Sequence, residues 1–273
     1  MKKMIQKVPI PLCGVMLGCA ALGNLLQSYG EGIRYVCGGI ATFLLILVLM
    51  KLIMFPEMIK EDFKNPILAS VAATFPMALM LLSTYIKPFI GVGAKYIWYF
   101  AIGLHIILIV YFTIKFLLKL QMPKVFASYF IVYVGIAVAA VTAPAFEELA
   151  IGAGAFWFGF LTLIGLLVLV TIRYMKYKEI PEPAKPLFCI YAAPTSLCVA
   201  GYVQSVTPKS REFLLAMLLV ATVLYVLALV KAISYLKLKF YPSYAAFTFP
   251  FVISAIATKQ TMVCLANMKQ PIP

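Results

Sequence analysis

The chain has 273 residues, of which 64% are hydrophobic and only 12% are charged. A soluble domain of this length has too little polar surface to cover so many apolar side chains, so the composition predicts an all-α, polytopic membrane protein. The formal net charge of +14 does not indicate nucleic-acid binding, because the Lys and Arg residues lie in short runs between apolar segments, where they orient membrane spans.

Nine apolar segments are each long enough to cross a bilayer, and we expect them to form a single transmembrane domain over residues 1–273. Most Lys and Arg residues lie at the N-terminus and in the connections after even-numbered segments. Because positive charge marks the cytoplasmic side, the N-terminus is predicted to be cytoplasmic in a multi-pass protein of the cell membrane. The approximate spans are residues 9–27, 33–55, 67–86, 95–119, 125–143, 147–173, 186–205, 212–236 and 242–261.

The composition of the spans alternates along the chain. Even-numbered spans contain no proline and are long aliphatic runs, which suit contact with lipid. Odd-numbered spans are rich in Ala, Gly, Ser and Thr, and four of the five contain a proline expected to kink the helix: Pro11, Pro76, Pro194 and Pro250. Small residues let helix backbones approach closely, and kinks are tolerated where neighbours or water satisfy the freed backbone groups. We therefore predict a row of helical hairpins. The kinked helices of the odd-numbered spans surround a central pore, and the helices of the even-numbered spans form an outer ring around the inner ones.

Phe249 stands immediately before Pro250, near the middle of the ninth span. Pro250 is expected to kink this helix and free the carbonyl of Ala246, which favours a position against other helices or a wet cavity. Ala245 and Ala246, one turn away, leave room for an aromatic ring to move. We predict that Phe249 plugs the pore, and the alternative is an ordinary packing aromatic.

Other candidate pore residues follow from the same pattern. Phe75 also precedes a proline and is a candidate for a second constriction, although packing in the core is the preferred interpretation. The inner spans contain no Asp or Glu in their interior, which favours passive conduction of anions over coupled transport. The candidate lining residues, mostly hydroxyl donors, are Thr74, Thr195, Ser196, Ala246, Thr248 and Ser254.

The sequence offers little for catalysis. His105 is the only histidine, and the six cysteines lie within or beside apolar spans. Neither a metal-ligand cluster nor a nucleophile with a nearby base can be assembled from these residues. We therefore expect no enzyme activity, no catalytic residue, no bound metal and no cofactor.

Motifs spread over nearly the whole chain carry a resemblance to a known family. They are VPIPLCGVMLGCAALGNL in the first span, EMIKEDFKNP before the third, IYAAPTS in the seventh, and KFYPSYAAFTFP followed by AIAT in the ninth. With these motifs the sequence resembles the tellurite-resistance/dicarboxylate transporter family, the TehA-like proteins, whose relatives include the plant guard-cell slow anion channels.

The resemblance implies a homotrimer in which each protomer holds a pore lined by five kinked inner helices and surrounded by five outer ones. It also implies that a phenylalanine of the ninth helix occludes the pore, and the shared threonine-phenylalanine-proline string places this role on Phe249. The family has ten helices, whereas nine spans are visible here. The expected function is a channel that passes small inorganic anions or small carboxylates down their gradient. The alternative is a secondary transporter that exports tellurite or exchanges C4-dicarboxylates, which would need an arginine clamp that the inner spans do not show.

Overall fold

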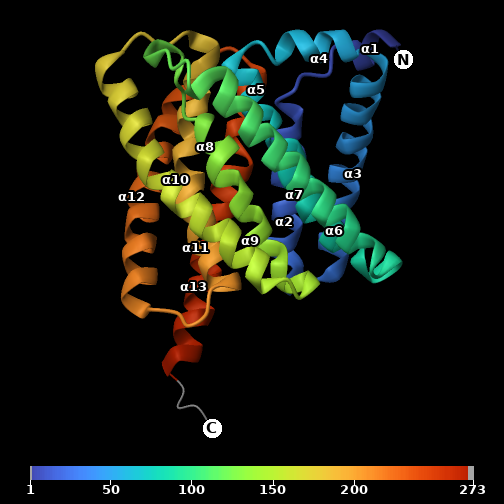
Figure 1. Ribbon diagram of the computed structural model, residues 1–273, viewed down its shortest axis with the longest axis vertical. Coiled ribbons are helices and arrows are strands. Elements are labelled where there is room, and N and C mark those ends of the chain that lie inside the picture. Colours follow the sequence, from blue (N-terminus) through green and yellow to red (C-terminus); the bar gives the residue numbers. More distant parts are fainter. Residues whose placement is uncertain (1, 270–273) are drawn as a thin grey trace.

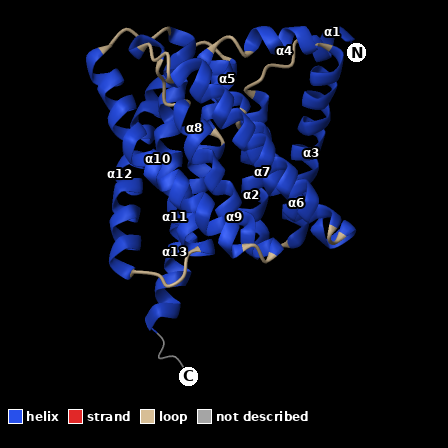
Figure 2. Ribbon diagram, in the orientation of Figure 1, coloured by secondary structure: helices blue, strands red, loops and turns tan. Residues whose placement is uncertain are grey.

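The computed structural model describes residues 2–269, and within this range it consists of helices joined by loops, with no strand (Figure 2). Nine helices of the described part are long and apolar enough to cross a membrane, which confirms the prediction of an all-α polytopic membrane protein. The N-terminus and the end of the last helix lie at opposite ends of the bundle (Figure 1). Two short helices, α1 (Lys2–Gln6) and α4 (Pro56–Asp62), lie across the end that carries the N-terminus (Figure 1).

The spans fall into two kinds. Each even-numbered span is one long α-helix, and these are α3 (Glu31–Met54), α7 (Gly93–Phe112), α10 (Leu149–Lys176) and α12 (Arg211–Tyr235). The third, fifth, seventh and ninth spans are each broken into two parts. These parts are α5 (Pro66–Ala72) with α6 (Thr74–Ile90), α8 (Tyr129–Tyr133) with α9 (Ala137–Thr142), the 3₁₀ segment Glu182–Ala192 with α11 (Ala193–Ser205), and the 3₁₀ segment Pro242–Phe247 with α13 (Phe249–Lys269). The first span is α2 (Leu12–Leu26).

The odd-numbered spans form a closed inner ring. Helix α2 packs against α6, α6 against α9, α9 against α11, α11 against α13, and α13 returns to α2. Helices α3, α7, α10 and α12 each pack on the outside of this ring. In the third, fifth and seventh spans 72%, 78% and 89% of the most apolar stretch is buried, against 17% to 28% in the even-numbered spans. The alternation of composition therefore corresponds to an inner and an outer layer.

The four prolines predicted to kink the odd-numbered spans lie at or just before helix starts rather than in helix interiors. Pro194 and Pro250 are the second residues of α11 and α13, Pro76 is the third residue of α6, and Pro11 immediately precedes α2. A proline in the first turn removes no intrahelical hydrogen bond, because the amides of that turn have no partner within the helix. The ninth span thus differs from the expected kinked helix, since the chain leaves α-helical geometry at Thr248 (φ −95°, ψ −90°) and a new helix begins at Phe249.

The fifth span is broken without an internal proline. Its two helices are joined by the 3₁₀ turn Val134–Ile136, and a Cβ atom at Gly135 would lie 2.7 Å from the sulfur of Met77 and 3.0 Å from the ring of His105. Glycine is therefore required here by a close approach of three spans. His105 is fully buried on α7, and its Nε2 lies 2.9 Å from the carbonyl of Val132, which indicates a structural role.

Arg173 fixes the start of the fifth span to the end of α10. Its guanidinium is buried, donates to the carbonyls of Pro123 and Tyr177 (both 3.2 Å), and lies 4.4 Å from the centre of the Phe126 ring. A planar guanidinium can serve two carbonyls and stack on a ring at once, whereas an ammonium cannot reproduce this geometry.

We expect Arg173→Lys to lower the free energy of unfolding by about 1–3 kcal/mol, the usual effect of losing hydrogen bonds to a buried charge. Thermal unfolding of the purified protein in detergent measures this change. The matched control is Lys176→Gln, which removes an exposed charge in the last turn of the same helix. Equal melting temperatures for the two variants would contradict the role given to Arg173.

Candidate functional site

Two large cavities lie inside the ring of odd-numbered spans, one toward each end of the bundle. The first, of about 350 Å³, lies toward the end that carries α1 and α5, and we call it the uncharged cavity. The second, of about 980 Å³, lies toward the opposite end, and we call it the cationic cavity. The long outer helices contribute almost nothing to either wall: Arg34, in the first turn of α3, is their only lining residue in the described part of the chain.

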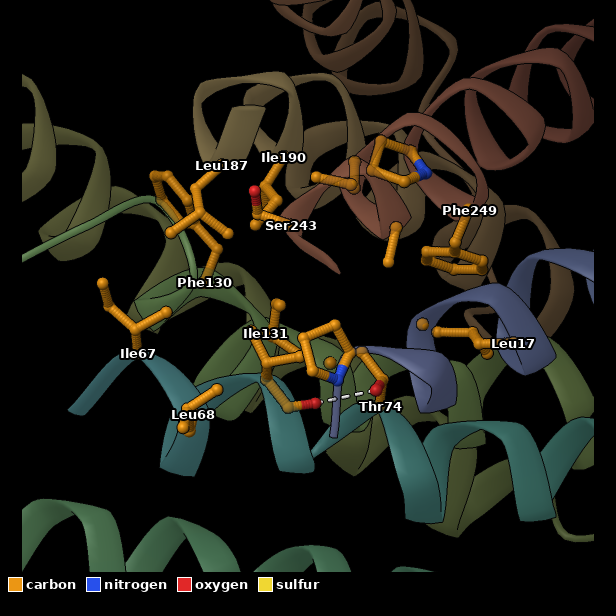
Figure 3. Close-up of a pocket in the computed structure, with 18 of the residues that line it drawn as sticks. Leu17, Ile67, Leu68, Thr74, Phe130, Ile131, Leu187, Ile190, Ser243 and Phe249 are labelled. Carbon is orange, nitrogen blue, oxygen red and sulfur yellow. Dashed lines mark hydrogen bonds between the residues drawn. The ribbon is translucent and has the colours of Figure 1, made fainter. Parts of the chain in front are cut away.

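The uncharged cavity has predominantly apolar walls. Figure 3 shows Leu17, Ile67, Leu68, Phe130 and Leu187 around it, with the Phe249 ring at one side. No Asp, Glu, Lys, Arg or His of the described chain lines it. Its hydroxyl groups are already engaged: Thr74 donates to the carbonyl of Val71 (2.7 Å), Ser243 to that of Pro183 (2.6 Å), and Tyr241 to Glu182 (2.8 Å).

The cationic cavity contains charge of one sign. Arg34, Lys209 and Lys259 line it, together with the amides of Asn24, Gln27, Gln204, Gln260 and Asn267, and no Asp or Glu of residues 2–269 does. The three cations come from different elements, namely the start of α3, the loop before α12, and α13.

One acid near the cationic end of the bundle, Glu148, is paired with a lysine that lines neither cavity. Glu148 pairs with Lys95 and accepts a hydrogen bond from Tyr99. The hydrogen bond from Lys95, followed by that from Tyr99, holds the pKa of the Glu148 carboxyl below its usual range. Glu148 therefore stays ionised and compensates Lys95 rather than the cations of the cavity.

Phe249 and Leu197 lie at the boundary between the two cavities, since they are the two residues within 2–269 that line both. Along the other inner spans, the last residue of one cavity and the first residue of the other are one helical turn apart. These pairs are Leu17 and Ala21 on α2, Met77 and Leu81 on α6, and Gly135 and Val138 around the start of α9. Residues three or four apart share a helix face, so one face of each of these inner helices follows the axis of the bundle.

Two glycines of α2 position Phe249. A Cβ atom at Gly14 would lie 3.4 Å from Cβ of Ala245, and one at Gly18 would lie 2.7 Å from Cβ of Thr248 and 3.0 Å from the amide nitrogen of Phe249. The hydroxyl of Thr248 donates to the carbonyl of Ala245 (2.7 Å) and lies within hydrogen-bond distance of that of Gly14 (3.1 Å). The break in the ninth span is thus held directly against α2, and the Gly-x-x-x-Gly spacing makes this contact possible.

The candidate residues from the sequence fall into two groups. Five of them line the uncharged cavity beside Phe249: Pro11, Thr74, Pro194, Ala246 and Pro250. The others line neither cavity, and these are Phe75, Pro76, Thr195, Ser196, Thr248 and Ser254. Phe75 lines a separate space of about 160 Å³ with Cys13 and Val48, between α2, α3 and α7.

Ser196 and Ser254 connect two inner helices instead of facing the axis. Their hydroxyl oxygens are 3.0 Å apart, and both contact the carbonyl of Ala192, at 2.8 Å and 3.0 Å. Ala192 precedes α11, so the two serines fix the start of α11 against α13. Neither serine lines a cavity, so their role is to join two inner helices.

Sequence reasoning did not single out Leu197, Arg34 or Lys209 as lining residues. Leu197 lies one turn after Ala193 and Pro194, and this spacing from a candidate proline was the only signal for it in the sequence. Arg34 and Lys209 stand in connections between spans, where charged residues are usually solvated, so their position in the sequence did not distinguish them.

A comparison with protein-family models finds that residues 7–268 match the model of SLAC1, described as voltage-dependent anion channel. The chain belongs to the SLAC1 family. This match confirms the resemblance seen in the sequence motifs. No curated protein matches the chain. As a SLAC1-family member the chain is a multi-pass membrane protein of a family of anion channels and transporters, for which small anions and lipid are the expected partners.

Proposed function

We propose that this SLAC1-family chain is a channel that passes small anions down their gradient through the two cavities, with Phe249 closing the passage between them. One observation carries the proposal: Phe249 and Leu197 are the residues that line both cavities, so an anion moving along the axis must pass them. The absence of Asp and Glu from both walls within residues 2–269 supports anions over cations.

The proposal includes the orientation and the assembly of the chain. The distribution of Lys and Arg supports a cytoplasmic N-terminus, so the uncharged cavity faces the cytoplasm and the cationic cavity faces outward. A homotrimer follows from the family resemblance, and the mass of the purified protein in detergent tests it. A monomeric mass would argue against the trimer without affecting the pore.

Anion substitution in recordings from the reconstituted protein tests the channel proposal. We expect reversal potentials that follow the gradients of chloride, nitrate or small carboxylates and do not follow the K⁺ gradient. Cation-selective currents would reject the channel proposal, and so would the absence of current in both the wild type and Phe249→Ala.

A coupled carboxylate transporter is the second candidate, and Arg34 is the observation that favours it. The guanidinium of Arg34 lines the cationic cavity, where it donates to Asn24 Oδ1 (3.2 Å) and to the carbonyl of Thr84 (3.3 Å). Arginine is the usual clamp for carboxylates. Carboxylate uptake that requires a proton or sodium gradient would favour this candidate, whereas flux that follows the anion gradient alone would favour the channel.

A further inference from the structure

The two cavities differ in what they offer an anion. In the cationic cavity Lys259 donates to the carbonyl of Leu25 (3.1 Å) and to the hydroxyl of Ser28 (2.6 Å), contacts that leave its charge uncompensated by an acid. Lys209 makes no hydrogen bond or ion pair within residues 2–269. Of these three cations, Arg34 alone forms an ion pair within residues 2–269, with Glu31 at 3.7 Å, and the side chain of Glu31 is 56% exposed. The wall therefore carries net positive charge.

Charge of one sign on the walls of a cleft focuses the field and raises the local concentration of counter-ions. A divalent anion gains about twice as much as a monovalent one from each cation, because the Coulomb energy is proportional to its charge. The cationic cavity should therefore collect divalent anions in preference to chloride or nitrate.

The uncharged cavity presents the opposite situation. The hydroxyl groups of Thr74, Ser243 and Tyr241 donate to protein acceptors, and no cation of the described chain lines the wall. An ion that leaves water for apolar surroundings loses its hydration, and the loss grows with the square of its charge. A weakly hydrated monovalent anion can cross such a region, whereas a strongly hydrated divalent anion meets a much higher barrier.

We propose that the cationic cavity is a binding site for strongly hydrated divalent anions, which lodge between Arg34, Lys209 and Lys259 and block conduction from that face only. This inference rests on the proposed function, because a block requires a conducting pore. It goes beyond that function in assigning a ligand class, three binding residues and a sidedness.

Inorganic sulfate, applied to one face of the membrane at constant ionic strength, is the probe. In excised patches of a conducting variant such as Phe249→Ala, we expect sulfate at the cationic face to reduce the nitrate current and sulfate at the opposite face to leave it unchanged. Lys209→Gln and Lys259→Gln should each raise the half-blocking concentration on the order of three- to tenfold, the size expected for one partly solvated ion contact. The block should also weaken as monovalent salt is raised.

Two variants that remove a lysine outside the cationic cavity serve as controls for the half-blocking concentration. Lys95→Gln removes a charge near the same face that lines neither cavity, and Lys237→Gln removes an exposed charge of the opposite face. Neither should change the half-blocking concentration as much as Lys209→Gln. Equal block from both faces, or block that both Lys209→Gln and Lys259→Gln leave unchanged, would overturn the proposal.

A binding measurement separates this proposal from the channel function. Sulfate stabilises most proteins through general exclusion, so the relevant quantity is the difference between variants in the rise of melting temperature with sulfate. We expect the rise to be smaller in Lys209→Gln and Lys259→Gln than in Lys95→Gln. If no variant conducts, the channel proposal fails while this difference still decides whether the cationic cavity binds sulfate. Equal rises in all variants would reject the site.

Discussion

Phe249→Ala should increase anion conductance on the order of ten- to a hundredfold, which corresponds to lowering the barrier by about 1.4–2.7 kcal/mol. Phe249 is one of two residues that line both cavities, and its ring is buried, with 6% of its surface exposed. We expect removal of the ring to widen the connection between the uncharged cavity and the cationic one, beside Leu197, the other residue that lines both. Currents of wild type and variant, reconstituted at matched protein density, give the ratio.

The matched control is Phe251→Ala, two residues further along α13. Phe251 is half-buried, packs at 5.8 Å between ring centres against Tyr225 of α12, and lines neither cavity. Phe251→Ala should therefore leave the anion conductance close to that of the wild type. If the two variants conduct equally, or if Phe249→Ala leaves the current at the wild-type level, Phe249 does not close the pore.

Gly18→Val should lower the free energy of unfolding and raise the basal anion current. The added Cβ would lie 2.7 Å from Thr248 and 3.0 Å from the amide of Phe249, so the break in the ninth span must move away from α2. Overpacking a tight contact typically lowers the free energy of unfolding by about 1–3 kcal/mol. Because the displaced backbone carries the ring of Phe249, we also expect a basal anion current above that of the wild type.

Gly39→Val on α3 is the control for Gly18→Val, because a Cβ at Gly39 has no neighbour within 4 Å. Both changes place a β-branched residue in the middle of a helix, so propensity effects cancel in the comparison. Melting temperatures in detergent and currents after reconstitution give the two readouts. A Gly18→Val protein as stable as Gly39→Val and with the basal current of the wild type would show that α2 does not hold Phe249 in place.

The inner and outer layers of the fold were predictable, because spans that face lipid and spans that face protein or a cavity differ in amino-acid composition. Aliphatic runs without proline mark the spans that face lipid, whereas small residues and prolines mark the spans that face protein or a cavity. The local geometry was less predictable. Pro250 was expected to kink a continuous helix, but the chain instead ends one segment at Phe247 and begins α13 at Phe249, which places proline in the first turn, where it costs no hydrogen bond.

The candidate lining residues show where sequence reasoning has too little information. The hydroxyls of Thr248 and Ser254 were candidates for lining the pore, yet each lies close to a backbone carbonyl of a neighbouring segment, Gly14 and Ala192 respectively. A serine or threonine in an inner helix has backbone carbonyls of several neighbouring segments around it. The rotation of the helix about its own axis determines which carbonyl the hydroxyl reaches, and packing sets that rotation. The face of α11 on which Leu197 lies depends on the same rotation.

Access to cysteines on either side of Phe249 tests the central claim most directly. Val141 lines the cationic cavity and Ile131 the uncharged one, and both are half-buried. In a background without native cysteines, we expect a negatively charged methanethiosulfonate reagent to modify Val141→Cys only from the cationic face and Ile131→Cys only from the opposite face. Adding Phe249→Ala should open each cysteine to both faces. Modification of either cysteine from both faces while Phe249 is present, or sidedness that persists after its removal, would contradict a pore closed by this ring.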